Sequence, residues 1–346
     1  MTFTADTDGL GLAELVRTRQ VTPAELLEAA VARAESAQER INCFAALYPE
    51  LAREQIAKGG LQGAYAGVPF ATKDLGVAVK GAPLTGGSRA YKDVVATEDS
   101  TLTRRFREAG LVFFGSTTTP EFGLTLTTES TLFGQTRNPW DRTRIAGGSS
   151  GGAAAAVAAG AIPVAHASDG GGSIRIPAAC CGVFGLKPSR GRMPMGPART
   201  EGWNGLSTVL VVSRTVRDSA AMLDLTHGPE TGSRYVAPPP ARPYLSELER
   251  DPKRLRIALW RTAPNGTVPD ADASAGLAAT AKLLESLGHV VVEAGPILNG
   301  EALGKAALFT IGANIAAQLD EHGAARGRPV GDDEIEPITA GMVRLG

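Results

Sequence analysis

Helical and strand patterns alternate along most of the chain. Residues 21–41 place Thr22 as a helix N-cap and Pro23 at the first helical position, and apolar residues then recur at helical spacing. The sequence therefore predicts an amphipathic helix there. Three further helices each end at or near a glycine and lead into a short apolar strand. These pairs occupy residues 99–115, 153–168 and 272–295.

Two other segments read as strands. Residues 42–47 form a short apolar run, and residues 67–76 read as a strand entering a turn, with Lys73 at the end of the strand. Helices that alternate with short apolar strands are typical of an α/β sheet covered on both faces. The sequence therefore predicts an α/β fold.

One segment, residues 227–244, is polar and rich in proline and glycine, which predicts a long irregular connection. Before it lie N-terminal helices at 8–60 and a core at 65–225. After it comes a peripheral α/β segment at 245–346, in which residues 255–260 look like another buried strand that could join the same sheet. We expect all of these parts to form a single domain.

Charge and composition exclude several functions. The 346 residues carry 35 basic and 36 acidic side chains, so electrostatics does not favour binding to nucleic acid or an anionic membrane. Residues 145–168 are uncharged, but five glycines and Pro163 interrupt them, which argues against a membrane span. The first ten residues do not resemble a signal peptide. We therefore expect a cytoplasmic protein.

The cysteines do not predict a metal site. Cys180 and Cys181 are adjacent, whereas ligand pairs need intervening residues. We interpret them as a buried pair without a metal.

Two loops rich in glycine and serine, residues 147–152 and 168–173, are candidate anion sites. A P-loop would need lysine and then serine or threonine after its glycines, and the first loop has neither. The dinucleotide fingerprint needs a preceding strand, but residues 138–146 read as a turn. We expect no nucleotide and no other organic cofactor.

A serine nucleophile would need a base. No histidine lies in a nucleophile-elbow context; the chain has only His166, His227, His289 and His322. A lysine can serve as the base when burial or neighbouring charge favours its neutral form, and Lys73 follows apolar residues. The alternative for Lys73 is a surface ion pair with Asp74.

Four segments, in this order and spacing, resemble the amidase signature family of serine hydrolases. They are GVPFATKDLG, TRNPWD, GGSSGGAAAAVAAG and SDGGGSIRIPAACCGVFGLKPSRGR. The likeness covers most of residues 10–225 and continues more weakly beyond the irregular connection. It implies a three-layer α/β/α fold with a central mixed sheet. It also implies an amidase that cleaves a carboxamide into acid and amine without a metal or cofactor.

The resemblance implies three catalytic residues. Ser173 matches the nucleophile of the family, Ser149 matches a bridging serine that follows a cis peptide bond, and Lys73 matches the base. In this relay a neutral Lys73 accepts a proton through Ser149 from Ser173, and Ser173 attacks the amide carbonyl. The resemblance assigns an oxyanion hole to the backbone of Gly170, Gly171, Gly172 and Ser173, where glycines permit close approach.

Three further residues are expected to support the site. Ser150 would begin a helix whose N-terminus adds positive potential beside it. Asp169 and Arg175 flank the nucleophile, and we expect them to pair and hold the loop in place.

The substrate is expected to be a small linear or cyclic amide. Residues 313–337, together with TRNPWD, look most like the bacterial branch that contains the cyclic-dimer hydrolase of nylon oligomers, whereas Ile176 argues against the glutamine-hydrolysing branch. Family members generally extend past the point corresponding to Gly346, so we expect a C-terminal part to be lacking. The alternatives are a catalytically silent protein that keeps a ligand pocket, and an esterase with the same triad. We also expect a possible homodimer.

Overall fold

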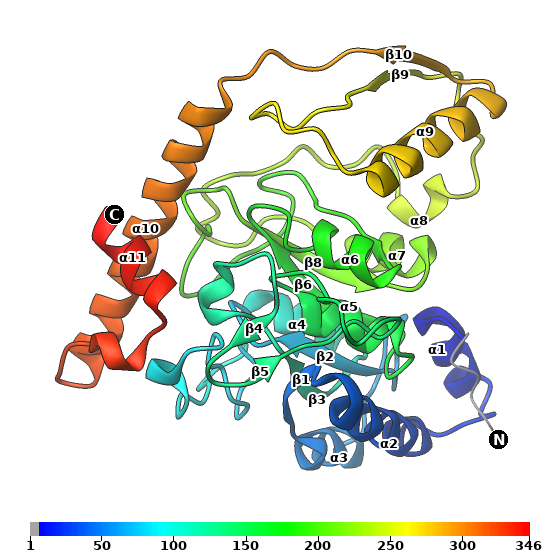
Figure 1. Ribbon diagram of the computed structural model, residues 1–346. Helices are drawn as coiled ribbons and strands as arrows, with labels where there is room; N and C mark the ends of the chain where they lie inside the picture. Colours follow the sequence, from blue (N-terminus) through cyan, green and yellow to red (C-terminus); the bar gives the residue numbers. More distant parts are fainter. Residues whose placement is uncertain (1–6) are drawn as a thin grey trace.

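The computed structural model describes residues 7–346 and is built around a six-stranded sheet (Figure 1). The strand order is β1–β3–β2–β6–β8–β7. The strands are β1 (Phe44–Leu47), β2 (Pro69–Lys73), β3 (Val112–Thr117), β6 (Val164–Asp169), β7 (Phe184–Gly185) and β8 (Thr208–Ser213). β2 runs parallel to β3 and β6, whereas the remaining neighbours are antiparallel. The predicted mixed sheet is confirmed.

Helices flank this sheet. They are α1 (Gly9–Arg17), α2 (Pro23–Ile41), α3 (Pro49–Ala57), α4 (Thr101–Glu108), α5 (Gly151–Ala158), α6 (Arg175–Cys181) and α7 (Val216–Thr226), with the 3₁₀ turns η1 (Arg89–Tyr91) and η2 (Glu121–Gly123). A small ladder pairs β4 (Glu129–Ser130) with β5 (Gly134–Gln135). Every residue of β2, β3 and β8 is buried, which requires cover on both faces and confirms the three layers.

Local signals in the sequence explain where helices begin. Thr22 and Glu25 form the reciprocal capping box of α2, with Pro23 at its start. Ser100 caps α4, which places Phe106 against Phe70 of β2 with ring centroids 4.8 Å apart. The strand that carries Lys73 is therefore packed against a helix with a well-defined start.

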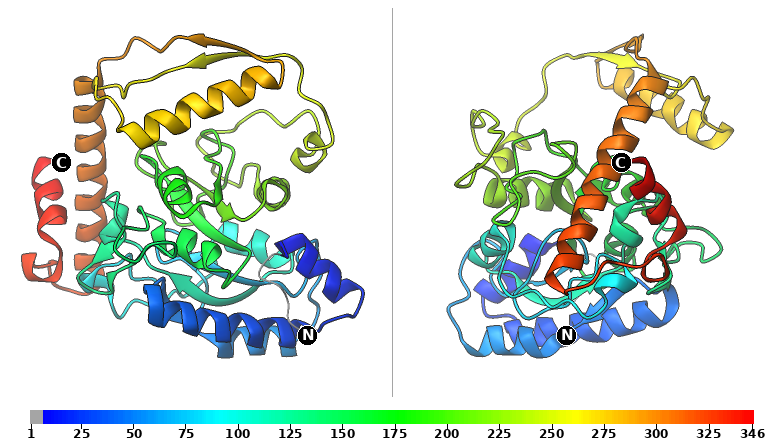
Figure 2. Two further views of the ribbon diagram at one scale, coloured as in Figure 1. Left: turned by 45° about the vertical axis from the view of Figure 1, so that its right-hand side comes forward. Right: turned by 90° about the vertical axis from the view of Figure 1, so that its left-hand side faces the viewer.

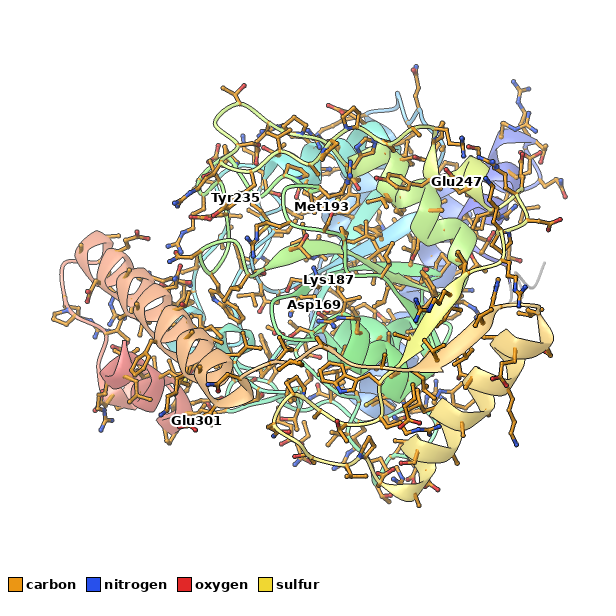
Figure 3. All side chains as sticks on the ribbon, turned by 90° about the horizontal axis from the view of Figure 1, so that it is seen from above. Asp169, Lys187, Met193, Tyr235, Glu247 and Glu301 are labelled. Carbon is orange, nitrogen blue, oxygen red and sulfur yellow. The ribbon has the colours of Figure 1, made fainter. Side chains whose placement is uncertain are left out.

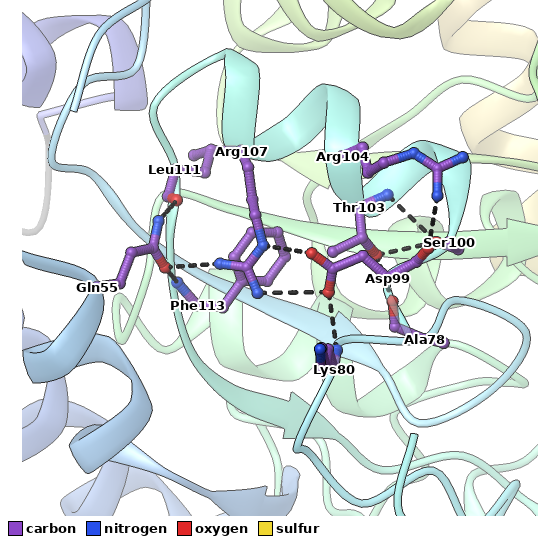
Figure 4. A network of polar contacts seen from close by, with 10 residues as sticks. All are labelled: Gln55, Ala78, Lys80, Asp99, Ser100, Thr103, Arg104, Arg107, Leu111 and Phe113. Carbon is purple, nitrogen blue, oxygen red and sulfur yellow. Dashed lines mark hydrogen bonds and ion pairs between the residues drawn. The ribbon is translucent and has the colours of Figure 1, made fainter. Parts of the chain in front are cut away.

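A polar network fixes α4 and α3 to the start of β3 (Figure 4). Arg107 Nε donates to Asp99 at 2.6 Å, and Arg107 Nη1 donates to Gln55 Oε1 at 3.1 Å. Gln55 of α3 also donates to the Leu111 carbonyl at 2.7 Å and accepts from Phe113 N–H at 3.3 Å. Because β3 is the direct neighbour of β2, this network supports the strand that carries Lys73.

Alanine brings α5 close to the sheet. Ala153, Ala154, Ala155 and Ala156 are all completely buried, and α5 contacts β1, β2, β3, β6 and β8. A helix with such small side chains can lie close against its neighbours. This places α5, which begins two residues after Ser149, against the central sheet.

The C-terminal part of the chain, from residue 244 onward, contains the remaining helices and strands. Its elements are α8 (Tyr244–Glu247), β9 (Arg256–Leu259), α9 (Ala271–Ser286), β10 (Val290–Glu293), α10 (Gly300–Ala325), η3 (Asp332–Glu334) and α11 (Pro337–Leu345). Before it, residues 227–243 contain no helix or strand, as the composition predicts.

The prediction that residues 255–260 could join the central sheet as a buried strand is wrong. β9 is a strand, but within residues 7–346 it pairs with β10 alone, in a parallel two-stranded sheet that lies away from the central one (Figure 2). Its side chains alternate between exposed and half-buried. The helix α9 between the two strands makes this a local βαβ unit, so β9 meets the strand that follows it in the chain.

Helix α10 spans 26 residues and docks only by its C-terminal half. Ile315 and Leu319 pack with Phe122 and Ala90 in a small second core, and α11 lies alongside (Figure 1). By length and composition alone, α10 is the one helix within residues 7–346 that could cross a membrane, and 17% of its most apolar window is buried.

Candidate active site

Lys73 lies at the carboxyl end of β2 and is completely buried. Its Nζ donates to Ser149 Oγ at 2.7 Å and to Ser168 Oγ at 3.0 Å. Burial lowers the pKa of Lys73 to about 7, although the negative charge of Asp169 opposes this shift. A substantial fraction of Lys73 is therefore neutral near pH 7 and able to accept a proton.

The alternative of a surface ion pair between Lys73 and Asp74 is wrong. Asp74 is also buried, and its carboxylate accepts the Thr85 backbone N–H at 2.8 Å and the Thr85 hydroxyl. The two side chains therefore have different partners, since Lys73 bonds to two serines and Asp74 to Thr85.

Ser149 follows a cis peptide bond from Gly148, as the resemblance implies. Gly148 has no room for a side chain, because an added Cβ would lie 2.4 Å from the Thr127 carbonyl oxygen. Ser150 is the N-cap position of α5, as expected. Ser150 Oγ donates to the Ser168 carbonyl at 3.2 Å and accepts the Ser168 N–H at 3.3 Å, which fixes the start of α5 against β6.

Ser173 lies in the loop between β6 and α6 and is 6% exposed. Asp169, at the end of β6 near the centre of the molecule, organises this loop (Figure 3). Its carboxylate accepts Gly172 N–H at 2.8 Å and Ile174 N–H at 3.1 Å. Arg175 donates to both carboxylate oxygens at 2.9 Å, so the predicted ion pair is present. Burial raises the pKa of Asp169, but Arg175 and the loop N–H groups outweigh burial and lower it.

The glycines of this loop allow neighbouring groups to lie close to its backbone. An added Cβ on Gly170 would lie 2.6 Å from the ring of Trp203, and Gly172 has φ of +126°. The N–H of Gly172 is already bonded to Asp169. The backbone N–H groups of Gly170, Gly171 and Ser173 are the remaining candidates for an oxyanion hole.

The two predicted serines line one cavity of about 530 Å³, together with Ser168 and Gly170. Within residues 7–346 no hydrogen bond joins Ser149 Oγ to Ser173 Oγ. The apolar part of the cavity wall includes Leu75, Leu84, Phe122, Trp203, Val209 and Ile315. Its charged part includes Glu98, Arg199, Glu201 and Glu321. Arg199 and Glu321 form an ion pair at 2.6 Å, which connects α10 to the loop between β7 and β8.

Several of these residues were not found from the sequence. Ser168 directly precedes Asp169 in the motif that contains Ser173, and this proximity was the available signal. Trp203 and the α10 residues gave no signal, because only the tertiary fold brings them to the cavity.

The adjacent cysteines Cys180 and Cys181 differ in exposure. Cys181 is buried, but Cys180 is exposed, so the prediction of a buried pair is wrong for Cys180. The two are consecutive at the end of α6 and project in different directions. Among the described residues no group of three or more His, Cys, Asp or Glu side chains could hold a metal ion.

Comparison with known proteins identifies the family. The family model described as Amidase matches residues 25–334. The chain belongs to the amidase family. It is 38% identical to the 6-aminohexanoate-cyclic-dimer hydrolase of Pseudomonas sp. (strain NK87), over 97% of this chain and 69% of that enzyme. It is also 40% identical to the putative amidase AmiC of Mycobacterium tuberculosis (strain ATCC 25618 / H37Rv), over 83% of this chain and 59% of that protein.

Solved structures agree with this amidase fold. A 6-aminohexanoate cyclic dimer hydrolase complexed with substrate superposes with a TM-score of 0.93 and 37% identity, over 99% of this chain and 72% of that one. A bacterial aryl acylamidase of the amidase signature family gives a TM-score of 0.89 and 29% identity, over 97% and 71% of the two chains. The protein is an amide C–N hydrolase that acts on a small-molecule amide.

Proposed function

We propose that the amidase uses Ser173 as nucleophile, Ser149 as proton bridge and Lys73 as base. The observation that carries this proposal is the buried Lys73 Nζ at 2.7 Å from Ser149 Oγ, in a cavity that Ser173 also lines. A lysine is a useful base near neutral pH only if its pKa is depressed, and burial of Lys73 lowers its pKa to about 7.

The proposed reaction has two halves. As Ser173 Oγ bonds to the amide carbon, its proton passes to Ser149 Oγ, and the proton of Ser149 passes to Lys73 Nζ. The C–N bond then breaks, and the relay returns a proton to the leaving nitrogen, which gives an amine and a Ser173 ester. Water, activated by the same relay, hydrolyses this ester to the acid.

Backbone donors would stabilise the negative oxygen that develops. The N–H groups of Gly170, Gly171 and Ser173 belong to the loop that Asp169 and Arg175 hold in place. Each such donor contributes about 3 kcal/mol of transition-state stabilisation in comparable sites. Ser168, the second hydroxyl at Lys73 Nζ, would fix the direction of the amine.

We further propose that the substrate is a small linear or cyclic carboxamide. A cavity of about 530 Å³ is of the size that holds one small molecule. The relatives include hydrolases named for a cyclic 6-aminohexanoate dimer and for aryl acylamides. The possible homodimer and the cytoplasmic location stay predictions.

The test is turnover of a small panel, followed by mass spectrometry of the products. The panel contains 6-aminohexanoate cyclic dimer, the corresponding linear dimer, an acyl anilide and an ester matched to the anilide. We expect acid and amine from at least one amide, and loss of that activity in Ser173→Ala. Turnover of the ester alone would favour the esterase alternative. Absence of turnover, together with absence of serine labelling by a fluorophosphonate, would contradict the proposed triad.

A further inference from the structure

One buried imidazole beside the proposed triad has no part in the relay described above. His166 lies on β6 and is completely buried. Its Nδ1 accepts the backbone N–H of Lys73 at 3.2 Å. Its Nε2 has no hydrogen-bond partner in the part of the chain that the structure describes.

The contact between Nδ1 and the Lys73 N–H replaces a bond of the sheet. β2 and β6 are paired at a single position, Ala71 with Ala165. Two residues further along β2, the backbone N–H of Lys73 donates to the side chain of His166. In a continued parallel ladder, this N–H would donate to a backbone carbonyl of β6. On the other side, β3 holds the end of β2 through Lys73 paired with Thr117. His166 therefore anchors the backbone of Lys73 to β6, on the side of β2 opposite to β3.

Packing alone does not explain an imidazole at this position. An apolar side chain could fill the space beside Phe106, whose ring lies edge-on to His166. The imidazole instead buries a nitrogen without a partner among the described residues, which is unfavourable for folding. That arrangement is understandable if Nδ1 is needed as an acceptor.

We propose that His166 is a positioning residue that acts through the backbone of Lys73 and keeps Lys73 Nζ in reach of Ser149. This inference rests on the proposed function, since it assumes that Lys73 is the base. The imidazole must stay neutral to accept at Nδ1, so its proton is on Nε2. Burial, followed by the charge of Lys73, lowers the pKa of His166 to about 3, which keeps Nδ1 available at any pH at which the enzyme would work.

The experiment compares His166→Asn, His166→Leu and Val211→Ala. Asparagine can present an oxygen near the position of Nδ1, whereas leucine fills space without an acceptor. Val211 is the cross-strand neighbour of His166 on β8, so Val211→Ala disturbs the same packing and leaves the acceptor intact. The readouts are the second-order rate of Ser173 labelling by a fluorophosphonate between pH 5.5 and 9, and the thermal unfolding midpoint.

We expect His166→Leu to slow labelling by about 10²-fold at all pH values, because a displacement of about 1 Å at a reacting group has that effect. His166→Asn should recover most of the rate, with the same acid limb as the wild type. Val211→Ala should label at a rate close to wild type even if its unfolding midpoint falls. A rate in His166→Leu close to wild type, or an equal loss in both His166 variants, would overturn the inference. If His166→Leu does not fold, the inference is tested by His166→Asn alone, through its labelling rate and the fall of that rate at acid pH.

Lys73→Met separates this inference from the proposed function. If Lys73→Met labels at the wild-type rate, Lys73 is not the base and the proposed function fails. If Lys73→Met is inactive while His166→Leu is fully active, only the positioning role of His166 fails.

Discussion

Replacement of Lys73 by methionine should make the protein more stable while it abolishes activity. The unfolded chain binds a proton at Lys73 with the ordinary pKa of 10.5, and the folded chain with a pKa of about 7. Folding below pH 10.5 therefore costs free energy, because the buried amine of Lys73 binds its proton less tightly than in the unfolded chain. Methionine has a similar length and no charge, so it removes this penalty.

The magnitude follows from linkage between proton binding and folding. A fall in pKa from 10.5 to about 7 corresponds to about 5 kcal/mol of lost stability at pH 7 and below. Methionine also removes the hydrogen bonds from Nζ to Ser149 and Ser168, which offsets part of the gain, at about 1 kcal/mol each. We expect Lys73→Met to be more stable than wild type by about 3 kcal/mol at pH 6.

The difference in unfolding free energy between Lys73→Met and the wild type also changes with pH in a definite direction. Between pH 7 and 10.5 the unfolded chain holds a proton on Lys73 that the folded chain lacks, so the wild type gains about 1.4 kcal/mol per pH unit relative to the variant. The advantage of Lys73→Met should therefore shrink above pH 7 and vanish by about pH 9, where the remaining penalty equals the loss of the two hydrogen bonds.

The assay is urea unfolding of both proteins from pH 6 to 9.5, followed by intrinsic fluorescence. Lys58→Met is the matched control, because the side chain of Lys58 is 77% exposed and its loss should matter little at any pH. A Lys73→Met protein that is less stable than wild type at pH 6 would refute the reasoning. So would a difference in stability that stays constant across this pH range.

Three further outcomes are expected. The rate of fluorophosphonate labelling should fall as pH drops below about 7, because Lys73 becomes protonated; a rate that stays flat to pH 5 would argue against Lys73 as base. Asp169→Asn should lower kcat by about 10²-fold in folded protein, since the Ser173 loop loses its anchor; a change within about threefold would argue against the anchor role. Thr339→Val should cost about 2 kcal/mol in urea unfolding and speed hydrogen exchange in α11, because the Thr339 hydroxyl donates to the buried carboxylate of Glu121. Unchanged exchange in α11 would show that this bond does not hold the helix.

Much of the fold could be predicted from local patterns. The cap at Thr22 and the apolar runs that follow the helices determine elements within a few residues of chain. The pairing of a strand could not be predicted from local patterns, because nothing within residues 255–260 indicates which sheet the strand joins. Its pairing with β10 depends on the intervening helix α9.

Some residues of the site could likewise be predicted from the sequence, whereas others could not. Lys73, Ser149 and Ser173 lie in long motifs, so the amino-acid sequence is sufficient to propose them as catalytic residues. Ser168 and His166 act through contacts between β6 and β2, which periodicity alone does not reveal. Ile315 reaches the cavity from a helix far from these motifs in the chain, through packing that local sequence does not encode.

Identification of the labelled serine is the most direct test of the proposed mechanism. The protein is treated with a fluorophosphonate at pH 8, digested and examined by tandem mass spectrometry, with Ser173→Ala and Lys73→Met in parallel. We expect a single adduct on Ser173, with no labelling of Ser173→Ala and far slower labelling of Lys73→Met. An adduct on Ser149 or Ser168, or labelling that persists in Ser173→Ala, would contradict the assignment of Ser173 as the nucleophile.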